Sequence, residues 1–147
     1  MEFSDIFLGL FIIFHSMVLG FMLLFIAVIA PTIFTVLDET NAGLLLRKFF
    51  PRMFLFGLVI LFFAIIVAVQ AERLDLTTLS SISALGFIFN AFYLTPLINK
   101  KRDELIENPD TSNAGFKLAH GFSVSIFISQ LIISLICLAM VHHPIIY

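Results

Sequence analysis

The stretch that decides the fold is residues 6–30, IFLGLFIIFHSMVLGFMLLFIAVIA, in which His15 is the one ionisable side chain. A helix needs about 20 apolar residues to cross the hydrocarbon core of a bilayer. Backbone polar groups must pair within the segment there, so a helix is the form we expect. The run is too long for the core of a cleavable signal peptide, and acidic residues precede it. We therefore interpret it as a retained membrane span.

Three further runs have similar character, and we expect spans at residues 53–70, 76–97 and 117–141. The third span is the most polar, and Pro96 bends or ends it because proline lacks a backbone N–H donor. Hydrophobic residues make up 61% of the 147 residues and charged residues only 12%, about half of the charged share in a soluble domain. The sequence predicts an all-α integral membrane four-helix bundle, a single transmembrane domain (1–147) without a long repeat.

Positive charge is unevenly distributed over the connections between these spans. Seven of the eight Lys and Arg residues lie in or beside the first and third connections, and only Arg73 lies in the second. Cytoplasmic connections carry the excess of Lys and Arg. We therefore expect the N and C termini outside, on the periplasmic face of a bacterial inner membrane that the chain crosses several times.

The first connection contains an apolar, helix-like piece at residues 43–50. Thr40 or Asn41 would cap this piece, and Pro51 would stop it. We therefore expect a short interfacial helix between helices 1 and 2. The third connection, residues 98–116, is hydrophilic and has a turn signal at residues 108–110.

Polar side chains recur at spacings of three and four in two of the spans, which places each set on one helix face. The set in the fourth span is His120, Ser123, Phe127, Gln130, Ser134 and Cys137. The set in the third span is Ser83, Gly86, Asn90, Tyr93 and Leu97. Polar residues within a membrane tend to face the bundle interior. We therefore expect an intramembrane polar cluster of His15, Asn90, Gln130 and Ser123, serving as a ligand site or a structural site.

His15 has two interpretations. As a functional residue it would bind haem or a metal ion, or relay a proton. As a structural residue it would be neutral and bonded to Gln130 or a serine hydroxyl, and this is the interpretation we favour. His120 lies near the other end of its span, too far along the membrane normal to share a metal with His15. We expect no cofactor. If one binds, His15 is the one reasonable metal ligand in the membrane, and it would bind haem or copper.

A second group of residues is expected on the cytoplasmic side, where it would bind lipid headgroups or form salt bridges: Arg52, Lys100, Arg102 and His120. The formal net charge of −2 indicates no nucleic-acid partner. No CxxC, HExxH, GxSxG or glycine-rich phosphate loop occurs, which argues against the common enzyme classes. No acidic residue lies inside a span, which argues against a carboxylate-driven transporter.

Three blocks of sequence carry a family resemblance. They are residues 30–34 with 41–43 and 49–52, then residues 90–99 with Arg102, and then residues 116–123 with Gln130. The chain resembles the transmembrane protein 205-like family, known in bacteria as domain of unknown function 4149. The resemblance implies a four-helix membrane protein and no activity, and Phe127 departs from the polar residue that is common in the family. More distantly, the pattern looks like the copper-resistance D and HemJ-type proteins, which handle copper or haem.

Three functional hypotheses follow. The first is a non-catalytic accessory or assembly subunit that contacts the bilayer and other membrane subunits, or a second copy of itself. The second is a haem- or copper-binding protein that uses His15. The third is a small transporter or lipid-handling protein with a polar cavity lined by Asn90, Gln130 and His15.

Overall fold

The structure is a computed structural model that describes residues 3–108 and 110–141, and every regular element in them is helical. It contains four helical rods that are long and apolar enough to cross a membrane, which confirms the predicted fold class. These rods are Ser4–Val36, Glu39–Gln70, Leu74–Glu107 and Ala114–Met140. Their elements are α1 (Phe3–Leu24), the π-helical turn η1 (Phe25–Ile29), α2 (Ala30–Val36), α3 (Glu39–Gln70), α4 (Leu74–Phe89), the π-helical turn η2 (Asn90–Leu94), α5 (Thr95–Glu107) and α6 (Ala114–Met140).

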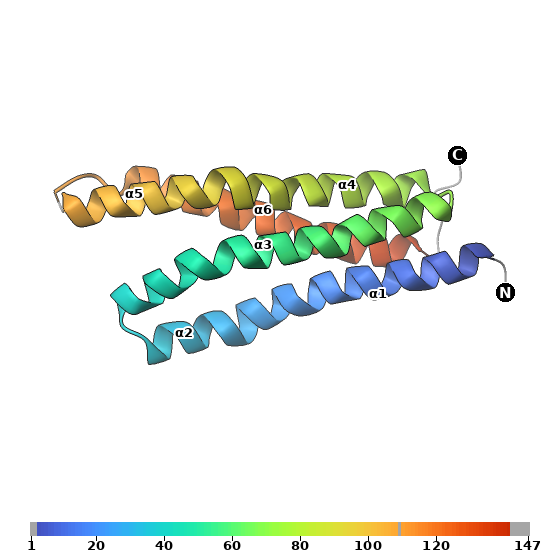
Figure 1. The fold of residues 1–147 in the computed structure, drawn as a ribbon, viewed down its shortest axis with the longest axis horizontal. Coiled ribbons are helices and arrows are strands. Elements are labelled where there is room, and N and C mark those ends of the chain that lie inside the picture. The colour runs from blue at the N-terminus through green and yellow to red at the C-terminus, as the bar shows by residue number, and fades with distance from the viewer. Residues whose placement is uncertain (1–2, 109, 142–147) are drawn as a thin grey trace.

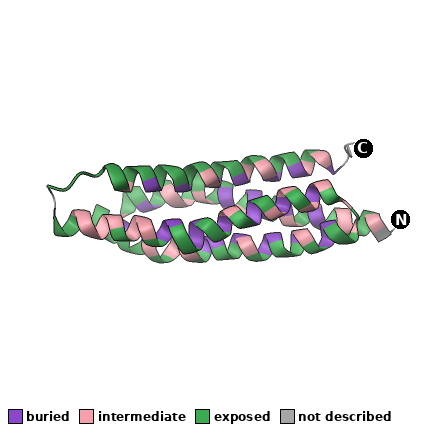
Figure 2. Cartoon of the chain, turned by 90° about the horizontal axis from the view of Figure 1, so that it is seen from above, coloured by how far each residue is buried: buried purple, intermediate pink, exposed green. Residues whose placement is uncertain are grey.

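The rods run antiparallel and pack in the cyclic order α1, α3, α4, α6 (Figure 1). The start of α1, the α3–α4 turn and the end of α6 lie together, at what we call the terminal end. The α2–α3 and α5–α6 connections lie at the opposite end, the connection end. Buried residues face the interior of the bundle (Figure 2), while outward residues such as Leu85 (63% exposed) and Phe62 (58% exposed) are apolar. Hydrocarbon suits this surface, and the chain is a multi-pass protein of the lipid bilayer.

The interfacial helix predicted at residues 43–50 is wrong as a separate element, because α3 runs through it from Glu39 to Gln70 with Pro51 inside. Proline removes one helical hydrogen bond and disturbs the next, and the Arg52 side chain donates to the Lys48 carbonyl there (2.8 Å). The cap is also neither Thr40 nor Asn41. The Asp38 carboxylate accepts from the Asn41 backbone N–H (3.0 Å), and this bond holds the pKa of Asp38 below its ordinary value.

Pro96 does not end the third rod, since α5 carries it on to Glu107 through most of the hydrophilic connection. Pro31 and Pro96 each follow a π-helical turn, η1 and η2 respectively. The ring of a proline collides with the carbonyl four residues earlier, and these carbonyls belong to Ala27 in η1 and Phe92 in η2. The wider π turn relieves both collisions without ending the helix.

The terminal end is tied together by Arg73, in the turn between α3 and α4. Its guanidinium donates to the Met140 and Val141 carbonyls (2.8 and 3.3 Å) at the end of α6. It also forms a two-bonded ion pair with Asp75 (2.7 and 2.9 Å). Glu72, with a φ of 56°, takes the left-handed conformation that this tight turn requires. The carbonyls left open at the end of α6 are therefore partly satisfied by a side chain.

The two halves of the chain repeat one structural plan, which the residue types alone did not show. We call α1–α3 the first hairpin and α4–α6 the second. His15 and Ser80 are 65 positions apart, and the same offset relates η1 to η2 and Pro31 to Pro96. It also relates positions that are buried in both hairpins: Phe11 and Leu76, Val18 and Ser83, Leu19 and Ala84, Met22 and Phe87. The packing pattern is repeated although the side chains differ.

Candidate functional site

His15 contacts Ser80, the residue at the equivalent position of the second hairpin. Its Nε2 atom lies 3.0 Å from the Ser80 hydroxyl oxygen, and both residues are fully buried. The Phe11 ring packs against the imidazole with 4.5 Å between ring centroids. The structure thus pairs His15 with a serine rather than with Gln130. Ser80 was absent from the predicted set, although its spacing of three from Ser83 on the same helix was a usable signal.

Gln130 of α6 also lies in the bundle interior, where its side chain contacts α4. Its Nε2 atom donates to the Ser83 carbonyl (2.9 Å). Gly86 makes this contact feasible, because a Cβ atom at that position would lie 2.9 Å from Gln130 Nε2. Both Gln130 and Ser83 are almost completely buried. This contact fixes the distance between α4 and α6 in the membrane interior.

Asn90 and Ser123 are the two predicted cluster residues that the structure brings into direct contact. The Ser123 hydroxyl donates to Asn90 Oδ1 (2.7 Å), and Asn90 Nδ2 donates to the Ser123 carbonyl (3.4 Å). The Thr95 hydroxyl donates to the Asn90 carbonyl (2.7 Å) and occupies an acceptor in the π turn. The four predicted residues therefore form three separate contacts along α4 and η2 rather than one cluster.

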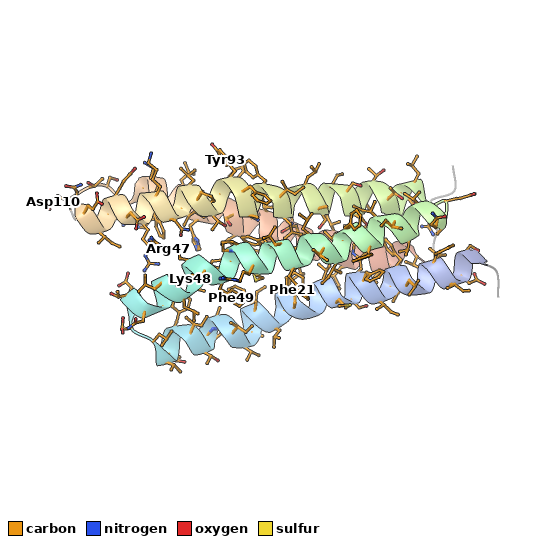
Figure 3. All side chains as sticks on the ribbon, viewed as in Figure 1. Phe21, Arg47, Lys48, Phe49, Tyr93 and Asp110 are labelled. Atoms are coloured by element: carbon orange, nitrogen blue, oxygen red, sulfur yellow. The ribbon has the colours of Figure 1, made fainter. Side chains whose placement is uncertain are left out.

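The η2 turn also changes which residues of the third rod face inward. Tyr93, predicted to lie on the polar face, is 58% exposed and stacks on Phe89 (centroids 4.9 Å apart). Figure 3 shows it on the outer side of the bundle. A π turn inserts a residue into the helical repeat, so Leu94 and Thr95 take the buried positions instead.

Five buried polar side-chain atoms have no hydrogen-bond partner among residues 3–108 and 110–141. They are His15 Nδ1, Arg47 Nε, Ser83 Oγ, Gln130 Oε1 and Ser134 Oγ. In the same part of the chain, no group of three or more His, Cys, Asp or Glu side chains converges as a metal site would require. His15 would have to turn away from Ser80 to offer Nε2 to a ligand. Haem or copper binding at His15 stays a prediction.

A cavity of ≈ 250 Å³ lies inside the connection half of the bundle. Most of its wall is apolar, and its polar residues come from α5 and α6. The apolar lining consists of Phe25, Ala30, Phe34, Leu46, Phe50, Met53, Phe54, Ile98, Val124 and Phe127. The polar lining consists of Thr95, Asn99, His120 and Ser123.

From the helix contacts we infer that the cavity opens between α2 and α6. Both helices line it, but in the described part of the chain α2 packs only against η1 and α3 and not against α6. Figure 1 shows α2 and the start of α3 diverging from α5. Phe34 on α2 is 65% exposed, and His120 on α6 is exposed and lies parallel to the Phe116 ring (5.9 Å between centroids). The opening therefore faces the position of the lipid.

Ionic contacts between α3 and α5 lie at the connection end of the cavity. Arg47 forms a two-bonded ion pair with Asp103 (2.7 and 3.2 Å) in the gap between these helices (Figure 3). Arg102 donates to the Glu39 carbonyl (3.2 Å), and its guanidinium occupies the space where a Cβ at Gly43 would be. Two cationic side chains thus bridge the divergent helices while the side between α2 and α6 stays open.

The predicted cytoplasmic-side site is not assembled as one group. Arg102 joins α5 to α3, and His120 lines the cavity. Arg52 lines a second, neighbouring pocket with Phe49 and Phe56, and Lys100 is exposed. None of the ion pairs among the described residues includes Arg52 or Lys100.

A sequence profile described as "Domain of unknown function (DUF4149)" matches residues 13–107 of the chain. The chain belongs to this family. The matched region of the DUF4149 profile runs from α1 to α5, so it includes His15, Asn90 and the cavity walls on α2, α3 and α5, but not α6. No curated protein and no solved structure matches the chain. The family description names no activity, so the site's own chemistry carries the functional argument.

Proposed function

We propose that this protein is a non-catalytic membrane module that takes an amphipathic molecule from the bilayer into the cavity between α2 and α6. The observation that carries the proposal is the cavity itself, ≈ 250 Å³ in volume, with a mainly apolar wall and a polar wall, open on the lipid-facing side. Concave, mostly apolar sites with a few placed polar groups are typical of small-molecule binding.

The position of the opening favours a ligand from the membrane over one from water. The mouth lies between Phe34 and His120 on two membrane rods, while Arg47 and Asp103 bridge the connection end. An amphipathic molecule already in the bilayer could enter sideways and bury its apolar part against the phenylalanines. Binding would be favoured if the apolar part of the ligand packs more closely against these rings than against the lipid chains.

Photo-crosslinking in native membranes tests this function. A bifunctional lipid probe with a photoreactive chain should label peptides of the cavity wall. Ala30→Phe fills the cavity from η1's C-terminal side and should abolish this labelling, whereas Ala27→Phe, on an exposed position of η1, should leave it unchanged. Equal labelling of both variants, spread over the outer surface, would contradict the proposal.

The accessory-subunit role is a compatible prediction, since a module that holds a lipid can serve a larger complex. Purification from native membranes in mild detergent should recover a second protein or a second copy of this chain. A species that runs as a monomer with no partner would count against it. The alternative of haem or copper at His15 is decided by an absorption spectrum and metal analysis of the same sample.

The inner-membrane orientation with outside termini is supported by charge. Arg47 and Lys48 of α3 and Lys100 of α5 lie toward the connection end, and Arg73 lies in the α3–α4 turn at the terminal end. Reporter fusions that are active only in the periplasm should be silent at residue 110 and active after residue 141. The reverse result would overturn the orientation.

A further inference from the structure

Resting on this binding function, we propose that the preferred ligand is a lipid whose head is one neutral, planar ring with carbonyl groups, as in the isoprenoid quinones. His120 and Asn99 would donate hydrogen bonds to one ring carbonyl. Phe25, Phe50 and Phe54 would pack against the ring. The chain of the lipid would leave through the opening beside Phe34.

The free hydrogen-bonding groups of the cavity set the chemistry of the head. Thr95 and Ser123 already use their hydroxyl protons, since both donate to Asn90. The side chains of Asn99 and His120 form no hydrogen bond within the described residues, and both carry N–H groups. Both side chains can therefore donate a hydrogen bond to a ligand, and a head that carries acceptors, such as carbonyl oxygens, would match these donors.

The charge of the head follows from the lining. Among the described residues, no Lys, Arg, Asp or Glu lines the cavity. A phosphate head would lose its hydration here without gaining a cationic partner, which is unfavourable in a membrane interior. A neutral head carries no such cost. The cationic residues nearby are engaged elsewhere, Arg47 with Asp103 and Arg102 with the Glu39 carbonyl.

The planar shape of the head follows from the aromatic wall. Phe25, Phe50, Phe54 and Phe127 contact one another with centroid distances from 5.4 to 6.3 Å. Aromatic faces and edges favour a flat conjugated ring over a flexible glycerol backbone. The volume, ≈ 250 Å³, is below the usual range of about 300–1,000 Å³ for ligand pockets, so one ring fits and its chain stays outside.

The repeated structural plan orients the head. Ala30 and Thr95 are equivalent positions in the two hairpins, as are Phe34 and Asn99, and all four line the cavity. In each pair the first hairpin supplies an apolar side chain and the second a polar one. One ring carbonyl would therefore face α5 and α6, and the apolar chain would leave past α2.

A single introduced tryptophan tests this inference, because the natural sequence contains none. Phe34→Trp places the fluorophore at the cavity mouth, and Phe62→Trp places a matched fluorophore on the exposed face of α3. The full chain is reconstituted in phosphatidylcholine nanodiscs with a short-chain quinone, which quenches tryptophan. We expect saturable quenching at Phe34→Trp and only linear, partition-driven quenching at Phe62→Trp.

The donors are then removed in the Phe34→Trp background. Asn99→Leu should raise the half-saturating mole fraction roughly fivefold, the effect of one lost hydrogen bond. His120→Phe should do the same while keeping a ring beside Phe116. A correctly folded variant, checked by circular dichroism and gel filtration, with unchanged saturation would overturn the role of that donor.

Two further lipids separate the possible failures. Phosphatidic acid and diacylglycerol with brominated chains also quench tryptophan. Saturation by either of these lipids and not by the quinone would refute the ring-head inference while supporting the binding function. Linear quenching by all three lipids would refute both.

Discussion

The two hairpins share a packing plan and differ in chemistry. Where the second hairpin has Ser83 in the interior, the first has Val18 at the equivalent position, and the second hairpin also buries Gln130 and Ser134. Among the residues that the structure describes, His15 is the one buried polar side chain of the first hairpin. The comparison teaches that one hairpin can pack almost entirely through apolar side chains. The buried hydrogen-bonding groups are concentrated in the second hairpin, on both sides of the α4–α6 contact.

The largest effect is expected where the first hairpin has no side chain at all. A Cβ at Gly57 would lie 2.8 Å from the Phe87 ring and 2.9 Å from the Phe21 ring, so Gly57→Ala should destabilise the bundle by about 2–3 kcal/mol. Gly20→Ala is the matched control, because beyond its chain neighbours and the backbone of its own helix turn no atom lies within 4 Å of its Cβ position. Denaturant titration in detergent measures both. Equal stabilities would mean that the rings of the two hairpins are not closely packed.

The next effect concerns the contact that joins equivalent positions of the hairpins. Ser80→Ala leaves both nitrogens of a buried His15 without a partner, which should cost about 1–2 kcal/mol. His15→Leu removes the imidazole as well, so the double variant should lose less than the sum of the single losses. A double-mutant cycle measures this coupling. Additive losses would show that the two side chains do not interact.

A smaller effect is expected within the second hairpin. Ser123→Ala removes the 2.7 Å hydrogen bond to Asn90 and should cost about 1 kcal/mol. Ser125→Ala is its control, because Ser125 is exposed and donates to the Gly121 carbonyl of its own helix. The same unfolding titration should show almost no change for the control. Indistinguishable variants would remove Asn90 from the set of stabilising contacts.

The smallest effect is expected at the ionic bridge between the hairpins. The Arg47 and Asp103 side chains are 32% and 49% exposed, so Arg47→Gln should cost less than about 1 kcal/mol. Salt screens such pairs, and the difference from the natural chain should shrink in 1 M salt. A cost that is independent of salt would indicate that packing, rather than charge, joins α3 to α5 there.

The sequence predicted the rods because the length of an apolar run is a direct constraint on membrane crossing. It also predicted the inward face of α6, where Ser123, Phe127, Gln130 and Ser134 are all buried, because that helix is regular. It failed at Tyr93, since a π turn changes the spacing rule without a clear sequence signal. Pro51 was interpreted as a helix stop, although α3 continues through it.

The cavity was not predicted from the residues that line it. The polar cavity that we expected used Asn90, Gln130 and His15, which instead pack against α4 or α6. The observed cavity arises because α2 diverges from α6, a relation between segments far apart in the chain. Spacing within one helix carries no information about such divergence.

The Arg73 contacts have a dynamic consequence. This side chain ties the α3–α4 turn to the Met140 and Val141 carbonyls at the end of α6, so the terminal end is held together by hydrogen bonds. The opposite end of the bundle lacks such a tie between α2 and α6. Amide hydrogen exchange should therefore be graded along the molecule, slow around residues 67–77 and fast around residues 30–37, so that one end acts as the hinge for the other.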